Sequence, residues 1–188
     1  MSSQRDLVFA IMRSTRTVFT TQSLMMMSGM DGMSLASLMH KLVRQGILLN
    51  PRRGIYAKSG YNREEMACSI FHPSYISMEY VLQRTGIVFQ YDETITSISY
   101  LTRNIDIDDS TYSFRKIVYQ LWAGMEGIVQ QDNICIATPE RAFLDMMHLS
   151  AGNCYFDNLR PLNRKLILQL LPHYHSMRLT ERVKNLLQ

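Results

Sequence analysis

Seven side chains between residues 34 and 53 have the chemistry of a binding site for a polyanion. They are Ser34, Ser37, His40, Lys41, Arg44, Arg52 and Arg53, and no acidic residue occurs among them. Lysine and arginine side chains bind phosphate groups, whereas hydroxyl, imidazole and guanidinium groups can also form hydrogen bonds with the edges of bases. These residue types predict contact with double-stranded DNA.

An amphipathic helix is predicted to carry the first five of these side chains. Its apolar residues follow the helical pattern i, i+3, i+4, i+7, i+8, and they are Leu35, Leu38, Met39, Leu42 and Val43. Ser34 stands before this stripe and is expected to cap the helix, whereas Gly46 suits the left-handed position that ends one. The polar side chains then share the opposite, exposed face.

A short β-hairpin is predicted to carry the two arginines. Residues Ile47–Leu49 and Ile55–Ala57 have the composition of strands, and Pro51–Gly54 is a turn signal with Arg52 and Arg53 at its tip. Such a tip suits contact with a phosphate backbone or a minor groove. The alternative is an ordinary solvated surface, since amphipathic helices followed by hairpins also occur in proteins that do not bind DNA.

The residues that precede this helix favour the DNA-binding interpretation. We expect a helix at Gln4–Arg13, a brief strand at Thr17–Thr20 and a second helix at Gln22–Ser28, capped by Thr21 and ended by Gly29. Followed by the third helix and the hairpin, this is the order of a winged helix-turn-helix, in which the third helix enters a major groove.

Charge divides the chain into two parts. Residues 1–60 hold eight lysines and arginines and two acids, a net charge of +6. Residues 61–188 hold twelve lysines and arginines and fourteen acids, a net charge of −2. The helix and strand pattern loosens around Gly60–Asn62, and we place the domain boundary there, between residues 1–60 and residues 61–188. Because only the first part is strongly cationic, we predict that it binds DNA and that the second domain has no polyanionic partner.

The second part is predicted to be an α+β domain with a small antiparallel sheet and helices packed on it. The segments that decide this are a turn at His72–Tyr75, a helix at Met78–Thr85 capped by Ser77, a strand at Glu93–Leu101, an acidic turn at Asn104–Ser110, a strand at Asn133–Ala137 and helices near residues 138–149, 161–171 and 179–187. Thr138 and Pro139 form the clearest helix start, because a capping hydroxyl precedes a proline at the first helical position.

Composition indicates a cytoplasmic protein that does not enter a membrane. No apolar run reaches the roughly 18–20 residues of a membrane span. The N-terminus carries Asp6 and lacks the apolar core of a signal peptide. Cys68, Cys135 and Cys154 are odd in number and widely spaced, which fits a reducing compartment and neither a disulfide framework nor a zinc site.

Two segments contain residue types that bind metals. Asp106, Asp108 and Asp109 are clustered carboxylates of the kind that hold hard cations, and a metal-dependent nuclease or nucleotidyltransferase would use such a cluster. His173 and His175 could chelate an ion. A solvated turn is the commoner explanation of each segment, and the glycine-rich phosphate-binding motifs of nucleotide enzymes are absent from the sequence. We therefore expect no metal, no cofactor and no enzymatic activity.

An aromatic segment in the second part has two interpretations. It contains Tyr112, Phe114, Tyr119 and Trp122, with Arg115 and Lys116 between them. Interleaved aromatic and cationic side chains could stack on single-stranded bases. The acidic net charge of this part favours the alternative, in which the aromatic side chains form the core of a small sheet.

Four stretches have the order and rough spacing of one known family. They are Arg53–Tyr56 (RGIY), Pro73–Ser77 (PSYIS), Ile95–Ile98 (ITSI) and Ala137–Asp145 (ATPERAFLD). Together they resemble the AbiEi-type antitoxins of bacterial abortive-infection toxin–antitoxin systems. The resemblance implies a winged helix-turn-helix that binds operator repeats upstream of its own operon and represses it. It also implies a C-terminal domain that counteracts a cognate nucleotidyltransferase toxin.

Two other functions fit the same residues. One is a stand-alone winged-helix transcriptional regulator whose second domain senses a ligand or mediates assembly. The other is a metal-dependent nuclease or nucleotidyltransferase built on the acids at residues 106–109. The neighbouring gene distinguishes an antitoxin from a regulator, because only an antitoxin relieves the toxicity of a neighbour on co-expression. A bound divalent ion would indicate the enzyme.

Overall fold

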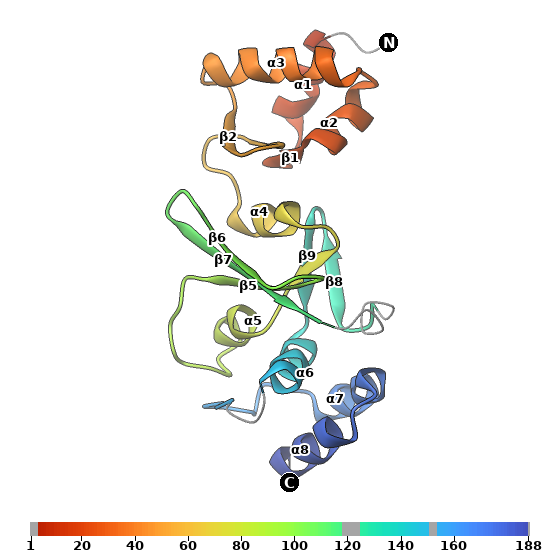
Figure 1. The fold of residues 1–188 in the computed structure, drawn as a ribbon. Helices are drawn as coiled ribbons and strands as arrows, with labels where there is room; N and C mark the ends of the chain where they lie inside the picture. Colours follow the sequence, from red (N-terminus) through yellow and green to blue (C-terminus); the bar gives the residue numbers. More distant parts are fainter. Residues whose placement is uncertain (1–3, 118–124, 151–153, 188) are drawn as a thin grey trace. The chain divides into compact units, whose positions relative to one another are not determined.

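The chain folds as two compact units, Met1–Ile70 and Phe71–Gln188. The computed structural model describes residues 4–117, 125–150 and 154–187. These residues form eight α-helices, one 3-10 helix and nine strands (Figure 1). The predicted α+β class is therefore confirmed.

The first unit combines four helices with a small sheet. It contains α1 (Gln4–Arg13), α2 (Thr21–Ser28), α3 (Gly32–Arg44) and α4 (Arg63–Ile70), with strands β1 (Val18–Thr20), β2 (Leu49–Arg52) and β3 (Ile55–Ala57). The strands pair in antiparallel fashion in the order β1-β3-β2. Helices α1 to α3 and the sheet share a core of Leu7, Ile11, Phe19, Leu24, Leu35, Leu38, Met39, Leu42 and Leu48.

Helix α3 begins earlier than predicted, because Asp31 and not Ser34 is its N-cap. The Asp31 carboxylate accepts hydrogen bonds from the backbone N–H groups of Met33 and Ser34, each at 3.0 Å. A carboxylate satisfies these otherwise unpaired donors and also interacts favourably with the positive end of the helix dipole. Gly46 follows the helix in the predicted left-handed conformation.

The N-cap of α2 also lies one residue earlier than predicted. The side chain of Thr20, not Thr21, accepts a hydrogen bond from the backbone N–H of Ser23 at 3.1 Å, and the Ser23 hydroxyl accepts from the Thr20 N–H at 3.0 Å. This reciprocal pair is a capping box. Gly29 ends the helix as predicted, and it does so in the left-handed conformation.

The β2–β3 hairpin starts two residues later than predicted. The backbone N–H groups of Ile47 and Leu48 donate to the carbonyl of Leu42 at 3.0 and 3.4 Å. Both residues therefore complete the end of α3 and do not pair in the sheet. Arg52 lies in β2, so that only Arg53 and the glycine after it form the turn.

Helix α4 belongs to the first unit, although the predicted domain boundary follows residue 60. Its buried Glu65 accepts hydrogen bonds from the backbone N–H groups of Thr17 and Val18 at 2.7 and 2.9 Å, and from the Thr17 hydroxyl at 2.8 Å. These bonds connect α4 to the start of β1.

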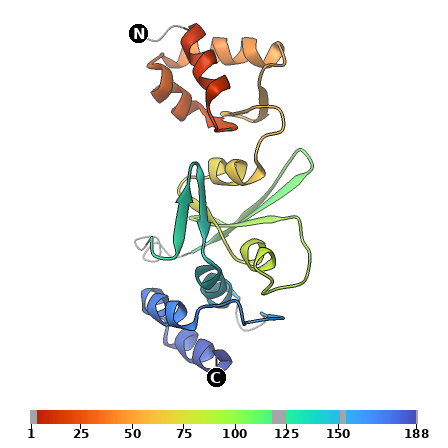
Figure 2. The ribbon, with the colours of Figure 1, turned by 180° about the vertical axis from the view of Figure 1, so that it is seen from behind.

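The second unit is built on a six-stranded mixed sheet. Its strands are β4 (Ser74–Ile76), β5 (Ile95–Ser99), β6 (Arg103–Ile107), β7 (Ser110–Lys116), β8 (Ile128–Gln131) and β9 (Ile134–Ala137). Its helices are α5 (Glu79–Arg84), α6 (Pro139–Leu149), α7 (Arg164–Leu170) and α8 (Met177–Leu187), with the 3-10 helix η2 (Leu171–Tyr174). Figures 1 and 2 show α5 and α6 on one side of the sheet, with α7 and α8 beyond α6.

The prediction of a small antiparallel sheet in this part is wrong. The strand order is β6-β7-β5-β4-β9-β8, in which β4 pairs in parallel with β9 and β5 in parallel with β7. The antiparallel β6–β7 hairpin lies at one edge of the sheet, and its inner strand β7 pairs in parallel with β5. A sheet of this mixed type requires pairings between distant segments, which local sequence patterns do not specify.

Two predicted turns lie partly in strands, with bends at His72 and Pro73 and a turn at Asp108 and Asp109. The turn predicted at His72–Tyr75 overlaps β4, which lies in the middle of the sheet and is entirely buried. The acidic turn predicted at Asn104–Ser110 is mostly β6, in which Ile105 and Ile107 are buried and the intervening acid is exposed. This alternation is the pattern of a half-buried strand.

A buried polar cluster connects β4, α6 and η2. The carboxylate of Asp145 accepts hydrogen bonds from the hydroxyls of Tyr75 (3.0 Å), Ser77 (2.7 Å) and Tyr174 (2.6 Å) and from Nε of Arg141 (3.3 Å). Burial raises the pKa of Asp145, and the Arg141 guanidinium and these hydroxyls oppose the rise. Ser77 belongs to this cluster and does not cap α5 as predicted.

Candidate nucleic-acid interface

The outward face of α3 carries four of the seven predicted binding residues. Ser37, His40, Lys41 and Arg44 are all exposed, while the opposite face buries Leu35, Leu38, Met39 and Leu42. The core fixes the rotation of the helix about its axis, so it also fixes which side chains face solvent. Because α3 contains no acid, this face offers cations and hydrogen-bonding groups to a polyanion.

Ser34 differs from the other α3 residues. Its hydroxyl donates to the carboxylate of Asp31 at 2.6 Å, and the side chain is partly buried. This hydroxyl and the backbone N–H groups of Ser34 and Met33 lower the pKa of Asp31. The structure therefore gives Ser34 a part in the helix cap.

Met33 is a candidate contact that sequence reasoning missed. It lies in the first turn of α3 with 85% of its surface exposed. At helical spacing it shares a face with Ser37, His40 and Arg44. An exposed apolar side chain can contact the methyl group of thymine. It carries no charge and no hydrogen-bonding group, so its residue type gave no signal in the sequence.

Arg52 and Arg53 lie on a different element from the other candidates. Arg53 is exposed in the β2–β3 turn, whereas Arg52 is partly buried in β2. The carbonyl of Gly54 in this turn accepts hydrogen bonds from the backbone N–H of Thr21 at 2.9 Å and from its hydroxyl at 3.2 Å. Figure 1 shows α3 and the hairpin on different sides of the unit. The candidates thus form two groups, the α3 face and a hairpin turn beside the first residue of α2.

The second unit contains a polar cavity of about 630 Å³. Its lining residues come from α5, β5, β6, β7, α6 and nearby segments, and they are Glu79, Gln83, Val88, Gln90, Asp92, Thr94, Thr96, Asn104, Thr111, Ser113, Arg115, Met146, Tyr155 and Asp157. Several hydroxyls are already bonded, such as that of Ser113 to Asn104 at 2.9 Å. Cavities of this size with hydroxyl, amide and charged groups suit a polar small molecule.

The acids and histidines considered as metal ligands form no cluster. Asp108 and Asp109 make up the β6–β7 turn, and Asp106 accepts the Thr111 hydroxyl at 2.8 Å. His173 and His175 are exposed in and after η2. Within the ranges 4–117, 125–150 and 154–187, no group of three or more such residues could hold a metal ion.

The aromatic segment is described only in part. Tyr112 and Phe114 are buried, as the core interpretation predicts. Phe114 packs edge-on against Phe71, with ring centroids 4.8 Å apart. Tyr119 and Trp122 lie outside the described residues.

Comparisons with known proteins give no family assignment for this chain. No protein-family model matches it, and no curated protein matches it. Among the helices that the structure describes, none is long and apolar enough to cross a membrane.

Proposed function

We propose that this protein is a DNA-binding antitoxin that represses its own operon and counteracts a nucleotidyltransferase toxin. The observation that carries the DNA-binding part is the exposed face of α3, which has cations and hydrogen-bonding groups and no acid. The element order α1-β1-α2-α3-β2-β3 supports a winged helix-turn-helix, with α3 as recognition helix and the β2–β3 hairpin as wing. The toxin-directed part rests on the family resemblance alone.

In the proposed complex the two groups of residues have different tasks. Ser37, His40 and Arg44 face base edges in the major groove, where they can discriminate between base pairs. Lys41, on the flank of the same helix, neutralises a phosphate. Arg53 contacts the backbone beside the start of α2. Contacts to phosphates position the protein, and contacts to bases determine the sequence that it prefers.

Binding of the full chain to the DNA upstream of its own gene tests this part of the proposal. Fluorescence anisotropy with that duplex and with a scrambled duplex, at several salt concentrations, gives both affinity and specificity. We expect log K to fall linearly with log salt, and the upstream duplex to be bound more tightly at every concentration. Absence of salt-dependent binding to the upstream duplex would overturn the proposal.

Co-expression with the neighbouring gene tests the toxin-directed part separately. We expect the full chain to restore growth of cells that express a toxic neighbour. An Arg44→Ala variant should restore growth equally well, because Arg44 lies in the first unit and the proposed antitoxin activity lies in the second. A neighbour that is not toxic would contradict the antitoxin part and leave the DNA-binding part standing.

The polar cavity of the second unit favours a second candidate function, a transcriptional regulator that senses a small molecule. Its hydroxyl, amide and charged lining would recognise a polar ligand, in contrast to a flat surface for a protein partner. This candidate requires a ligand that changes the affinity of the full chain for its upstream DNA. A substitution that fills the cavity, such as Ser113→Phe, should then abolish the response to the ligand without weakening DNA binding.

A further inference from the structure

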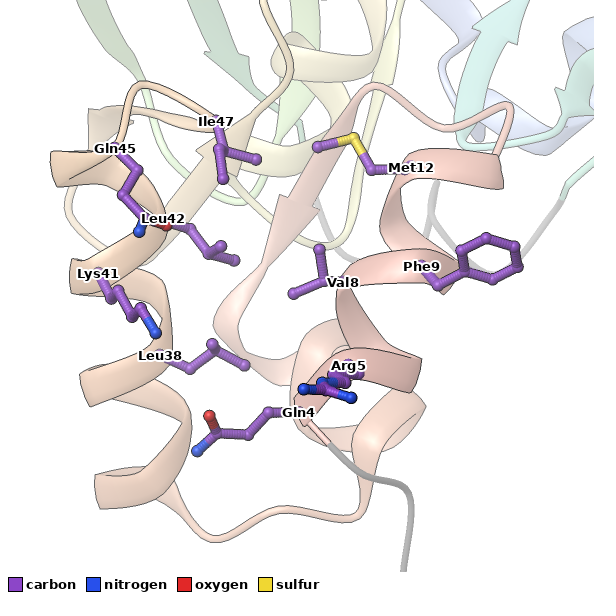
Figure 3. A pocket seen from close by; sticks show the side chains of 10 residues that line it. All are labelled: Gln4, Arg5, Val8, Phe9, Met12, Leu38, Lys41, Leu42, Gln45 and Ile47. Atoms are coloured by element: carbon purple, nitrogen blue, oxygen red, sulfur yellow. The ribbon is translucent and has the colours of Figure 1, made fainter.

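An apolar groove of about 400 Å³ lies between α1 and α3 in the first unit (Figure 3). Its lining residues are Gln4, Arg5, Val8, Phe9, Met12, Leu38, Lys41, Leu42, Gln45 and Ile47. Val8, Leu38 and Leu42 lie along its length, and Met12 and Ile47 lie at one end. Met12 and Ile47 keep 45% and 38% of their surfaces exposed, so apolar side chains that would gain from burial line an open site.

The opposite end of the groove is polar and cationic. Figure 3 shows Gln4 and Arg5 of α1 at that end, and Lys41 partway along α3 between Leu38 and Leu42. No acidic residue is among those that line the groove. At the other end the Gln45 amide lies beside Ile47, so both ends have a polar group, but the lining cations Arg5 and Lys41 lie away from Ile47. The groove therefore has a cationic side that suits a negatively charged group and an apolar length that suits a hydrocarbon.

We infer that this groove binds a small amphipathic carboxylate, such as a medium-chain or aromatic acid. Its carboxylate would lie between Arg5 and Lys41, and its apolar tail would lie along Val8 and Leu42 toward Ile47. The volume falls within the range of small-molecule sites, roughly 300–1,000 Å³. A second copy of the chain is a poor occupant, because residues 1–60 carry a net charge of +6 and two such surfaces packed face to face repel each other.

Occupation of the groove has a consequence for DNA binding. Lys41 belongs both to the groove and to the exposed face of α3. A bound carboxylate neutralises Lys41 and places a negative charge beside the DNA backbone, so it weakens DNA binding. This consequence, unlike binding of the ligand itself, rests on the proposed function, and the small molecule would act as an inducer.

Titration of the full chain with octanoate tests the site without DNA. Amide chemical shifts in a two-dimensional NMR spectrum should move for residues of α1 and α3 that line the groove. Butyrate should bind more weakly, by about threefold to fourfold for each methylene that it lacks. The neutral octanol should also bind more weakly than octanoate. Equal affinities for butyrate and octanoate, or shifts confined to other parts of the chain, would overturn the inference.

A pair of matched variants tests the cationic end. Lys41→Gln should weaken octanoate binding about fivefold and leave octanol binding unchanged, because only the carboxylate is attracted to the ammonium group. Arg16→Gln removes an exposed cation of the same unit that does not line the groove, and it should leave both affinities unchanged. An equal loss of octanoate affinity in both variants would show a general effect of net charge and contradict the site.

The consequence for DNA binding is tested by adding octanoate to the complex with upstream DNA. We expect octanoate to release the DNA at concentrations that saturate the groove, and butyrate at the same concentration to release little. Octanoate binding without release would refute the inducer role alone, whereas failure of DNA binding would refute the proposed function alone. Self-association that Ile47→Ser abolishes would identify the groove as an interface between copies and overturn the small-molecule site.

Discussion

Arg44 and Arg53 illustrate how the surroundings of a residue determine what its loss should do. Arg44 lies on the exposed face of a helix whose rotation is fixed by the core, and Arg53 lies in an exposed turn. In the proposed complex the first meets a base edge and the second a phosphate. Their replacements should therefore differ in how strongly the effect depends on DNA sequence.

Replacement of Arg53 by alanine should weaken DNA binding without changing its specificity. A phosphate contact carries no sequence information, so the affinities for upstream and scrambled duplexes should fall by the same factor. The slope of log K against log salt should become less negative by about 0.9. Anisotropy titrations at several salt concentrations measure both quantities. An unchanged slope would mean that Arg53 does not touch the backbone.

The Asp31 cap makes the stability of the first unit depend on pH. Its pKa is lowered by the Ser34 hydroxyl and nearby backbone N–H groups, so the ionised form stabilises the folded state. This contribution is complete above the unfolded pKa of about 3.9 and is lost as pH falls through the lower folded pKa. In urea denaturation the chain should have a larger free energy of unfolding than an Asp31→Asn variant near pH 7. This difference in free energy should become smaller below about pH 3. A difference that does not change with pH would contradict this role of the charge.

At the scale of elements, sequence patterns predicted helices better than strands. Helix α1 spans Gln4–Arg13 as predicted, and the predicted Thr138 cap of α6 accepts from the N–H of Arg141 at 3.3 Å. Both depend on local signals, namely apolar periodicity and a capping hydroxyl before proline. Strand β4 has three residues and follows a proline, so its position in the middle of a sheet depends on partners far away in the sequence.

The Glu65 side chain of α4 should contribute strongly to the stability of the first unit. Glu65→Ala leaves two backbone N–H groups and a hydroxyl of the β1 segment without their acceptor, so we expect a loss of about 2–3 kcal/mol in the free energy of unfolding. The neighbouring, more exposed Glu64→Ala should cost less than about 1 kcal/mol. Urea denaturation followed by circular dichroism measures both. Equal losses in the free energy of unfolding would contradict a stabilising role for the buried hydrogen bonds of Glu65.

At the scale of the whole molecule, the cluster around Asp145 connects segments that are distant in the sequence. Tyr75 and Ser77 belong to one stretch of the family resemblance, and Arg141 and Asp145 belong to another. The sequence showed both stretches without indicating that they touch. All of these hydrogen bonds lie inside the second unit. The four residue types are therefore explained by the packing of that unit, and the cluster does not identify a binding site.

Removal of the central carboxylate should strongly destabilise the second unit. Asp145→Ala leaves a buried guanidinium without its charged partner, which costs about 3–5 kcal/mol. Asp109→Ala changes the net charge equally at an exposed turn and should cost less than about 1 kcal/mol. Denaturant midpoints of the two variants provide the comparison. A cost for Asp145→Ala no greater than that for Asp109→Ala would refute the structural role of the cluster.

The candidate site was predictable where a local pattern specified it and not elsewhere. The apolar stripe of α3 predicted that Ser37, His40, Lys41 and Arg44 would be exposed together, and they are. The partly buried position of Arg52 depends on the register of β2 with β3, and the groove beside Lys41 depends on the packing of α1 against α3. Neither follows from local periodicity, because both are set by contacts between elements.

The most direct test of the central claim compares two charge reversals, Arg44→Glu on α3 and Arg103→Glu on β6. Both residues are exposed, so the variants have the same net charge and differ only in where the negative charge lies. At one salt concentration Arg44→Glu should weaken binding to the upstream duplex about 100-fold, because it places a carboxylate in the major groove of the DNA, close to the negatively charged phosphates. Arg103→Glu should weaken it by less than about threefold. Equal losses in the two variants would contradict the assignment of α3 as the helix that contacts DNA.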